Sequence, residues 1–238
     1  MKTPSILIVA ILSLFLSPSC SKKSNSHTQT CQIITVTDQY GTSTTTYNIT
    51  YDNNNRISTE QYTSSGTATS RVFTYLGNTV IVATTAGTVN SRDSLTINSD
   101  GLIASDYYSD NNSNSSNTIY TYSGTEVLKS VLTQGANPPQ TSTYTWTNGD
   151  MTGANQNGTS STYTYNTKAS QSGDYWQIVQ LVNFGGFFVR TAHQLAGYQT
   201  GTTIENINYT YDNTGKITNV TGTQNTTVEN ITYQYMCN

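Results

Sequence analysis

Residues that could carry acid–base chemistry are few in this 238-residue chain. There are two histidines: His27 lies in a polar N-terminal stretch, and His193 lies in an aromatic-rich segment. A catalytic triad needs a histidine held by an acid and placed beside a nucleophile, and the sequence has no nucleophile-elbow motif. We therefore expect no triad, and we expect His193 to be a structural or surface residue.

Motifs for metals and cofactors are also missing from the sequence. Metal centres need clustered Cys, His or carboxylate ligands, and no such cluster occurs. The segment 110–121 begins like a calcium loop, but Ser115 stands where that loop needs Gly, and Thr121 where it needs Glu. No phosphate-binding or dinucleotide-binding glycine motif occurs. We expect neither a metal nor a cofactor, and interpret 110–115 as an Asn- and Ser-rich loop.

A pair of carboxylates is the remaining route to catalysis, because a glycoside hydrolase can draw its two acids from distant parts of a chain. Four acidic residues lie in turn-like sequences and are assigned to turns: Asp52, Asp100, Asp150 and Asp212. Few candidates are left. An acid-pair hydrolase in the mouth of the fold is the alternative function, and a non-enzymatic protein is the first expectation.

Aromatic side chains give the one binding hypothesis, because exposed Tyr and Trp rings stack on sugars while their polar atoms form hydrogen bonds. The segment 174–200 holds three of the five Phe and one of the two Trp. A glycan or protein ligand is predicted to contact aromatic residues of this segment: Tyr175, Trp176, Phe184, Phe187 and Phe188. The alternative is that these rings belong to the core.

Composition favours a β-structure and excludes one class of partner. The net charge is −3 and there is no basic cluster, which argues against nucleic acid binding. Only 10% of residues are charged, but 18 Tyr and many Thr and β-branched residues favour a pleated, half-buried surface over disorder.

The N-terminus has the order of a secretory signal: a positive start, an apolar run over 6–16, and small residues up to Cys20. The run is shorter than the roughly 20 residues of a transmembrane helix. We predict a signal peptide over 1–19 and a polar, flexible tether over 20–30. The alternatives are a buried N-terminal helix and ordinary cleavage near Ser19.

From residue 31 onward, bulky residues alternate with Thr, Asn or Gln, which is the period of a half-buried antiparallel strand. Turn sequences separate the alternating segments, for example at 52–56 and 212–216, and the units recur about every 19 to 26 residues. We predict one all-β domain over 31–238. Its fold is an antiparallel meander of 14 to 17 strands that forms a barrel or a barrel-like sheet, with an irregular insertion near 174–200.

At 211–217, Tyr-Asp-Asn-Thr-Gly-Lys-Ile, the sequence resembles the YD-type hairpin repeats of large secreted bacterial proteins. Taken whole, it is similar to a family of uncharacterised Bacteroidetes lipoproteins, which share a lipobox, a short tether, a first Cys, many such hairpins and a Cys near the end. The match covers nearly the whole chain after Cys20, although several middle hairpins lack the Asp or Gly. The resemblance implies a porin-like antiparallel sheet and no known activity.

Cys20 resembles the lipidated Cys of bacterial lipoproteins, although Leu16 stands four residues before it instead of three. A lipid anchor would make a membrane-spanning barrel redundant, so we expect a soluble barrel with aromatic residues inward and Thr outward. The residues after the Cys, Ser21-Lys22-Lys23, include no acid. The resemblance then implies an outer-membrane lipoprotein that faces the periplasm.

Two further modifications are predicted. Export would place Cys31 and Cys237 in an oxidising compartment, where a disulfide can join the two ends of the domain. Two free buried thiols are the alternative. Asp93-Ser94-Leu95 resembles the acceptor for Bacteroidetes O-glycosylation, which makes Ser94 a candidate site.

Overall fold

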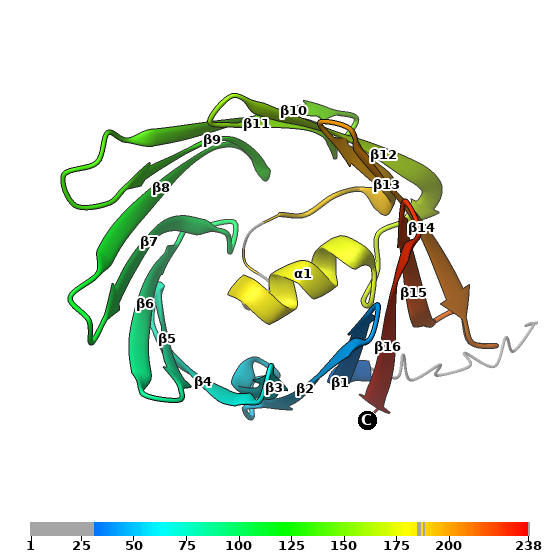
Figure 1. The fold of residues 1–238 in the computed structure, drawn as a ribbon, viewed down its shortest axis with the longest axis horizontal. Coiled ribbons are helices and arrows are strands. Elements are labelled where there is room, and N and C mark those ends of the chain that lie inside the picture. Colours follow the sequence, from blue (N-terminus) through cyan, green and yellow to red (C-terminus); the bar gives the residue numbers. More distant parts are fainter. Residues whose placement is uncertain (1–30, 185–186, 188, 238) are drawn as a thin grey trace, which may run out of the picture.

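In the computed structural model, which describes residues 31–184, 187 and 189–237, each strand pairs antiparallel with the next one along the chain. The last strand pairs with the first, so the sheet closes into a barrel, and one helix lies inside it (Figure 1). The elements are β1 (Cys31–Tyr40), β2 (Ser43–Tyr51), β3 (Ile57–Ser64), β4 (Thr67–Leu76), β5 (Thr79–Ala86), β6 (Val89–Ile97), β7 (Ile103–Asp110), β8 (Ser115–Ser123), β9 (Glu126–Thr133), β10 (Gln140–Thr147), β11 (Asp150–Gln156), β12 (Thr159–Ala169), α1 (Tyr175–Phe184), β13 (His193–Thr200), β14 (Thr203–Tyr211), β15 (Ile217–Gln224) and β16 (Thr227–Cys237). The predicted all-β barrel is confirmed, with 16 strands among the described residues.

The alternation of residue types divides the two faces of the sheet. In β2, Tyr47 and Ile49 face the lumen, and Ile49 is 3% exposed, whereas Thr46 and Asn48 face outward and are exposed. Successive side chains of a strand point to opposite faces, so this division extends over the barrel. Large apolar residues on the outer face are scattered among Thr, Ser, Asn and Gln. The expectation of aromatic residues inside and Thr outside is confirmed for most of the barrel.

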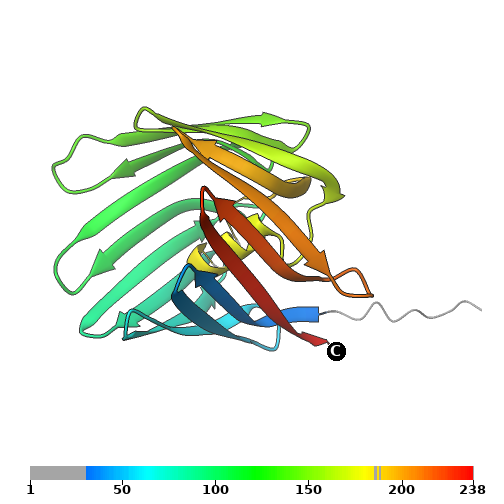
Figure 2. The ribbon, with the colours of Figure 1, turned by 45° about the vertical axis from the view of Figure 1, so that its right-hand side comes forward.

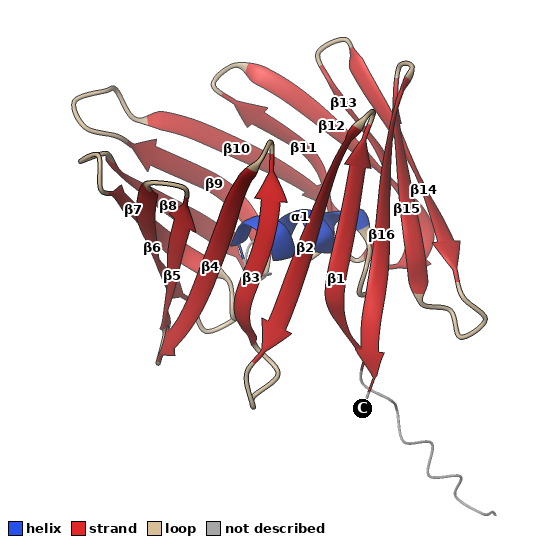
Figure 3. Cartoon of the chain, turned by 60° about the horizontal axis from the view of Figure 1, so that its bottom comes forward, coloured by secondary structure: helices blue, strands red, loops and turns tan. Residues whose placement is uncertain are grey.

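The two ends of the barrel differ. β1 begins and β16 ends at the same end, where a disulfide joins Cys31 to Cys237 as predicted (Figure 3). We call this the closed end, because α1 crosses the lumen near it. At the other end, which we call the open end, short turns such as 41–42 and 65–66 connect the strands, and no described segment crosses the lumen (Figures 1 and 3).

Bulges recur near the closed end and explain many of the tyrosines. Where the register shifts, for example between Thr210 and Tyr211, one residue of the partner strand is left unpaired. A ring hydroxyl or indole N–H from the neighbouring strand then donates to a carbonyl at such a shift. Six pairs follow this pattern: Tyr51 to Ile33, Tyr75 to Ile57, Trp146 to Val127, Tyr165 to Met151, Tyr209 to Leu195 and Tyr235 to Ile217, at 2.6–2.9 Å.

Asx turns link several strands, as the sequence predicted at Asp52 and Asp212. The Asp212 carboxylate accepts from the backbone N–H of Thr214 at 2.8 Å and of Lys216 at 3.0 Å. Asp100 lies in the predicted turn at 98–102, but the side chain that accepts the two corresponding backbone bonds is that of Asn98. An amide oxygen serves the same purpose as a carboxylate oxygen in this turn.

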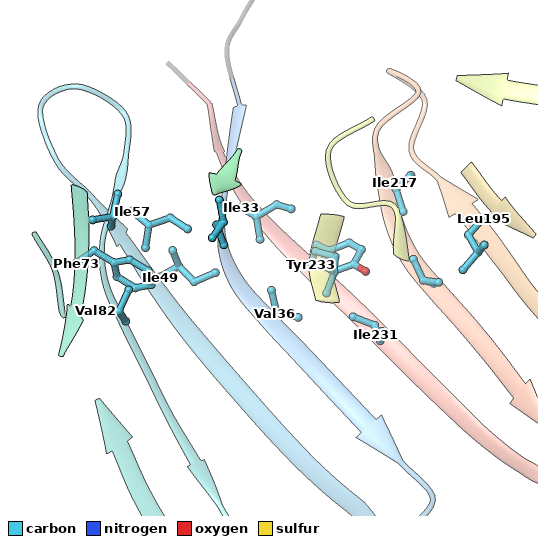
Figure 4. Packing of buried hydrophobic residues seen from close by; sticks show 14 of the residues in the cluster. Ile33, Val36, Ile49, Ile57, Phe73, Val82, Leu195, Ile217, Ile231 and Tyr233 are labelled. Atoms are coloured by element: carbon cyan, nitrogen blue, oxygen red, sulfur yellow. The ribbon is translucent and has the colours of Figure 1, made fainter. Parts of the chain in front are cut away.

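The lower lumen, toward the closed end, is the hydrophobic core. Apolar side chains from several strands, such as Ile33, Phe73 and Ile217, form one buried cluster (Figure 4). The helix contributes Ile178, which is 4% exposed, and Trp176, whose ring lies 5.3 Å from that of Tyr163. Figure 2 shows the helix within the tilted strands from a second direction.

Asp174 fixes the start of the helix. Its carboxylate accepts from the backbone N–H of Gln177 at 2.9 Å, which is the bond of an N-cap, and from the hydroxyl of Ser170 at 2.5 Å. The helix is short and buries side chains on nearly opposite faces, such as Ile178 and Gln180, so its stability comes from packing inside the barrel.

The predicted insertion over 174–200 is longer than the observed one. The non-strand segment ends before His193, and 193–200 form β13. The alternation is hidden there because a register shift places Leu195 and Tyr198, three residues apart, on the same face. The described residues include no helix long and apolar enough to cross a bilayer. The signal peptide over 1–19 and the tether over 20–30 with Cys20 fall outside the described residues and stay predictions.

Candidate functional site in the upper lumen

The upper lumen, between the helix and the open end, is lined by polar groups. The charge of these groups differs between the two halves of its circumference. On β8 to β13 the inward side chains are neutral, such as Thr118, Ser142 and Ser161. On β14 to β16 and β1 to β7 they include six carboxyl groups below the rim: Asp38, Glu60, Asp93, Asp106, Glu205 and Glu229. We call this half of the upper lumen the acidic wall.

Glu205 and Glu229 meet over a glycine. Glu205 on β14 is 4% exposed, and its carboxylate accepts a hydrogen bond of 2.6 Å from the Tyr198 hydroxyl. A Cβ at Gly222, on the strand between them, would collide with the carboxylate of Glu205 and lie 3.1 Å from that of Glu229. Glu205, Glu229 and the Tyr175 hydroxyl of α1 lie close enough together to interact electrostatically. The missing side chain of Gly222 therefore makes room for an acid pair.

Glu60 is the most deeply buried acid of the wall, at 0% exposure. Arg71 on the neighbouring strand donates to one of its carboxylate oxygens at 3.0 Å. The other oxygen is buried and has no hydrogen-bond partner among the described residues. The Arg71 guanidinium also lies 5.4 Å from the centre of the Tyr62 ring. Among the described residues, Arg71 is the one basic side chain that faces the upper lumen.

A hollow of about 220 Å³ lies in the lumen beside Arg71. Asp93, Asp106 and Tyr108 line its other side, together with Thr84 and Ser91. One oxygen of Asp106 is buried and unpartnered. A larger hollow, of about 930 Å³, lies on β2 to β5 and is lined by Thr, Ser, Asn and Gln with Tyr62. It offers no carboxylate, amine or imidazole, so we place the candidate site in the lumen.

Burial penalises the charged form of a carboxyl group, and it raises the pKa values of five acids of the wall: Asp38, Glu60, Asp93, Asp106 and Glu229. Burial raises the pKa of Glu60 to about 7, although Arg71 opposes the shift. Burial, with the charge of Asp93, raises the pKa of Asp106 to about 7. Burial, with Asp38 and Glu205, raises that of Glu229 to about 7. These three acids change charge close to neutral pH.

Of the aromatic residues predicted to bind a ligand, the three with described side chains are partly buried inside the barrel. Tyr175 reaches the acid pair, Trp176 packs on Tyr163, and Phe187 packs on Tyr75 with ring centres 6.4 Å apart. Phe184 ends α1, and Phe188 falls outside the described residues. The described rings pack against the two hydrophobic clusters, which favours the core interpretation for Trp176 and Phe187.

His193 has a structural partner that the sequence did not indicate. Its Nδ1 lies 2.7 Å from the Asp150 carboxylate, and its backbone N–H donates to the same group at 2.9 Å. Asp150 was predicted to be a turn residue; it is instead 8% exposed and ties β11 to the start of β13. Ser94 lies in the middle of β6, partly buried, and its glycosylation stays a prediction. No group of metal ligands occurs among the described residues.

Sequence reasoning missed the acidic wall, although a signal for it was present. Four of its acids stand two residues from a buried aliphatic residue, in the same phase of the alternation: Val36 with Asp38, Asp93 with Leu95, Glu205 with Ile207, and Glu229 with Ile231. An acid in the inward phase of a strand must face the lumen. Reading the phase strand by strand would have found these acids.

Comparison with known proteins identifies the fold only. No family model and no curated protein matches the sequence. Among solved structures, a porin-like protein from Bacteroides uniformis aligns with a TM-score of 0.64 and 12% identity, over 86% of this chain and 96% of that one. A porin-like protein from Bacteroides vulgatus aligns with a TM-score of 0.58 and 15% identity, over 86% and 98%. The chain thus has the fold of these porin-like barrels.

Proposed function

We propose that this protein is a lipid-anchored, non-enzymatic binding protein of the bacterial cell envelope, which takes its ligand into the upper lumen. One observation carries the proposal: the lumen is blocked by a packed helix at one end and is polar, acidic and open at the other. Such a barrel encloses a cavity with a single opening. Polar groups without partners in the wall of this cavity fit a ligand-binding site.

The outer face supports anchoring over spanning. A barrel that crosses an outer membrane carries an apolar band about 25 Å tall on its outside. Here Thr, Ser, Asn and Gln dominate the outer face, and the strongly exposed large apolar residues, such as Leu76 and Ile119, are scattered. The predicted lipid at Cys20 would then be the attachment to the membrane. The periplasm-facing orientation remains part of the proposal, on the evidence of Lys22 and Lys23.

The geometry of the acid pair argues against a glycoside hydrolase. The two carboxyl groups of such enzymes are about 5–10 Å apart, which leaves room for the sugar or a water. Here an oxygen of Glu205 and an oxygen of Glu229 both lie within 3.1 Å of the point that a Cβ of Gly222 would occupy, and the Tyr198 hydroxyl donates to Glu205, so the pair leaves little room for a sugar between them. A structural, adhesin-like module is the other alternative, and it would leave the open lumen without a role.

Fractionation of the full chain and its Cys20→Ala variant tests the proposal. We expect the wild type in the membrane fraction, with an acylated Cys20 by mass spectrometry, and the variant in the aqueous fraction. If the variant also partitions into detergent, the barrel spans the membrane and the proposal is wrong. A matched Cys31→Ala variant, which keeps Cys20, should stay with the membrane.

A further inference from the structure

We propose that the acidic wall binds an organic polycation, of the class of linear aliphatic polyamines, with its ammonium groups on separate carboxylates. The inference deepens the proposed function, on which it rests, by naming the class of ligand. It is carried by the arrangement of the buried acids, by the oxygens they leave unsatisfied, and by the aromatic rings between them.

The acids outnumber the bases. Six carboxyl groups face the upper lumen below its rim, and Arg71 is the one base among the described residues that faces them. Buried charges in proteins are normally paired, because an unpaired one is costly. Glu60 and Glu205 are at most 4% exposed, and each has a buried oxygen without a hydrogen-bond partner in the described chain. These oxygens can accept N–H bonds from a ligand.

The spacing of the acids favours an extended ligand over a single metal ion. Among the described residues, no three acidic, His or Cys side chains come close enough together to hold a metal. The acids form two groups instead, with Glu205, Glu229 and Asp38 on β14, β16 and β1, and the others on β3, β6 and β7. A chain with several amines can place one on each group. The hollow of about 220 Å³ beside Asp93 and Asp106 can hold one chain end.

Tyrosine rings between the two groups suit the methylene segments and the charge of such a ligand. Tyr47 and Tyr62 lie side by side on β2 and β3, with ring centres 4.7 Å apart. The guanidinium of Arg71 already lies over the Tyr62 ring, so this surface accepts a cation within the protein itself. The neutral wall on β8 to β13 offers no competing positive charge. A ligand with ammonium groups and an aliphatic backbone therefore matches the acidic wall in both charge and surface.

Calorimetry with the full mature protein tests the inference, using spermine as the probe and tetraethylene glycol as an uncharged chain of similar length. We expect spermine to bind at pH 8 and low salt, to weaken steeply with added salt, and tetraethylene glycol not to bind. Calcium chloride is the third arm. If calcium competes for the same site with equal or greater affinity, or if spermine does not bind, the inference is wrong.

Isosteric variants locate the site. Glu205→Gln and Asp106→Asn lie in different groups of the acidic wall, and each should weaken spermine binding about tenfold or more, as expected for loss of a charge-assisted bond. Asp100→Asn removes the same charge at an exposed turn of the closed end and should bind like the wild type. Thermal melts verify that each variant is folded. If one of the two acidic-wall variants does not fold, Asp93→Asn is used in its place.

Three outcomes separate this inference from the proposed function. If Asp100→Asn weakens binding as much as Glu205→Gln, spermine is attracted by net charge alone and the acidic wall is not its site. If spermine fails but a neutral glycan binds, and Tyr62→Ala abolishes that binding, the lumen binds a ligand of another class. The proposed function then stands without the inference. Failure of Cys20→Ala to leave the membrane would overturn the proposed function while leaving spermine binding intact.

Discussion

Removing the disulfide gives the sharpest quantitative test of the fold. We consider the double variant Cys31→Ser/Cys237→Ser. The bond joins residues 206 positions apart, so it closes nearly the whole domain into one loop. The loop-closure entropy lost from the unfolded chain corresponds to about 5 kcal/mol at 25 °C. For a domain of this size, that loss lowers the melting temperature by about 10–20 °C.

Urea unfolding followed by tryptophan fluorescence measures the effect, since Trp146 and Trp176 both lie in the packed region. The reduced wild type is the matched control and should unfold at the same urea concentration as the variant. The bond restricts the unfolded state, so its removal should increase the denaturant dependence of the free energy of unfolding. The near-UV circular dichroism of the folded state should not change. A variant within about 1 kcal/mol of the oxidised wild type would refute the loop-entropy reasoning.

Three further predictions concern the lumen. Gly222→Ala should destabilise the fold by about 1–3 kcal/mol, because the added Cβ collides with Glu205. Urea unfolding measures this loss. A stability equal to that of the wild type would show that the acid pair moves freely. The free energy of unfolding should fall as the pH rises from about 4.5 to 7, because the pKa of Glu229 is raised to about 7 in the folded protein. The stability contributed by the protonated carboxyl is complete only below the ordinary pKa of Glu and is lost as the group ionises. Glu229→Gln should flatten this slope, and an unchanged slope would contradict the raised pKa of Glu229. Tyr209→Phe should cost about 1 kcal/mol through the lost bond to the bulge carbonyl, whereas Tyr107→Phe, on the exposed outer face, should cost nothing measurable by the same assay.

The barrel was predictable because its strands are half-buried on one face. That arrangement imposes period-two alternation, as in 47–51 and 207–211, and the Asx turns at Asp52 and Asp212 mark where strands reverse. The disulfide was predictable because its two cysteines flank the alternating region. The extent of the insertion was not, since the register shift in β13 breaks the alternation that defines a strand.

The candidate site was much harder to predict. Glu60 and Glu229 are 169 positions apart, and only closure of the barrel places them on one wall. The aromatic rings of 174–200 drew attention because aromatic residues are common in binding sites, but a helix inside a barrel needs the same rings for packing. Asp150 was assigned to a turn because its sequence neighbours suit a turn, and its partner His193 lies 43 positions away.

The disulfide has a mechanical consequence for a protein held by its N-terminal segment. A pull on the chain before Cys31 would load β1 at the seam of the barrel, where β1 meets β16. Without the crosslink, the load would peel β1 away by breaking its hydrogen bonds one after another. With Cys31 bonded to Cys237, the force divides between both strands of the seam at their ends. A barrel held through that segment would therefore resist opening along this seam under load.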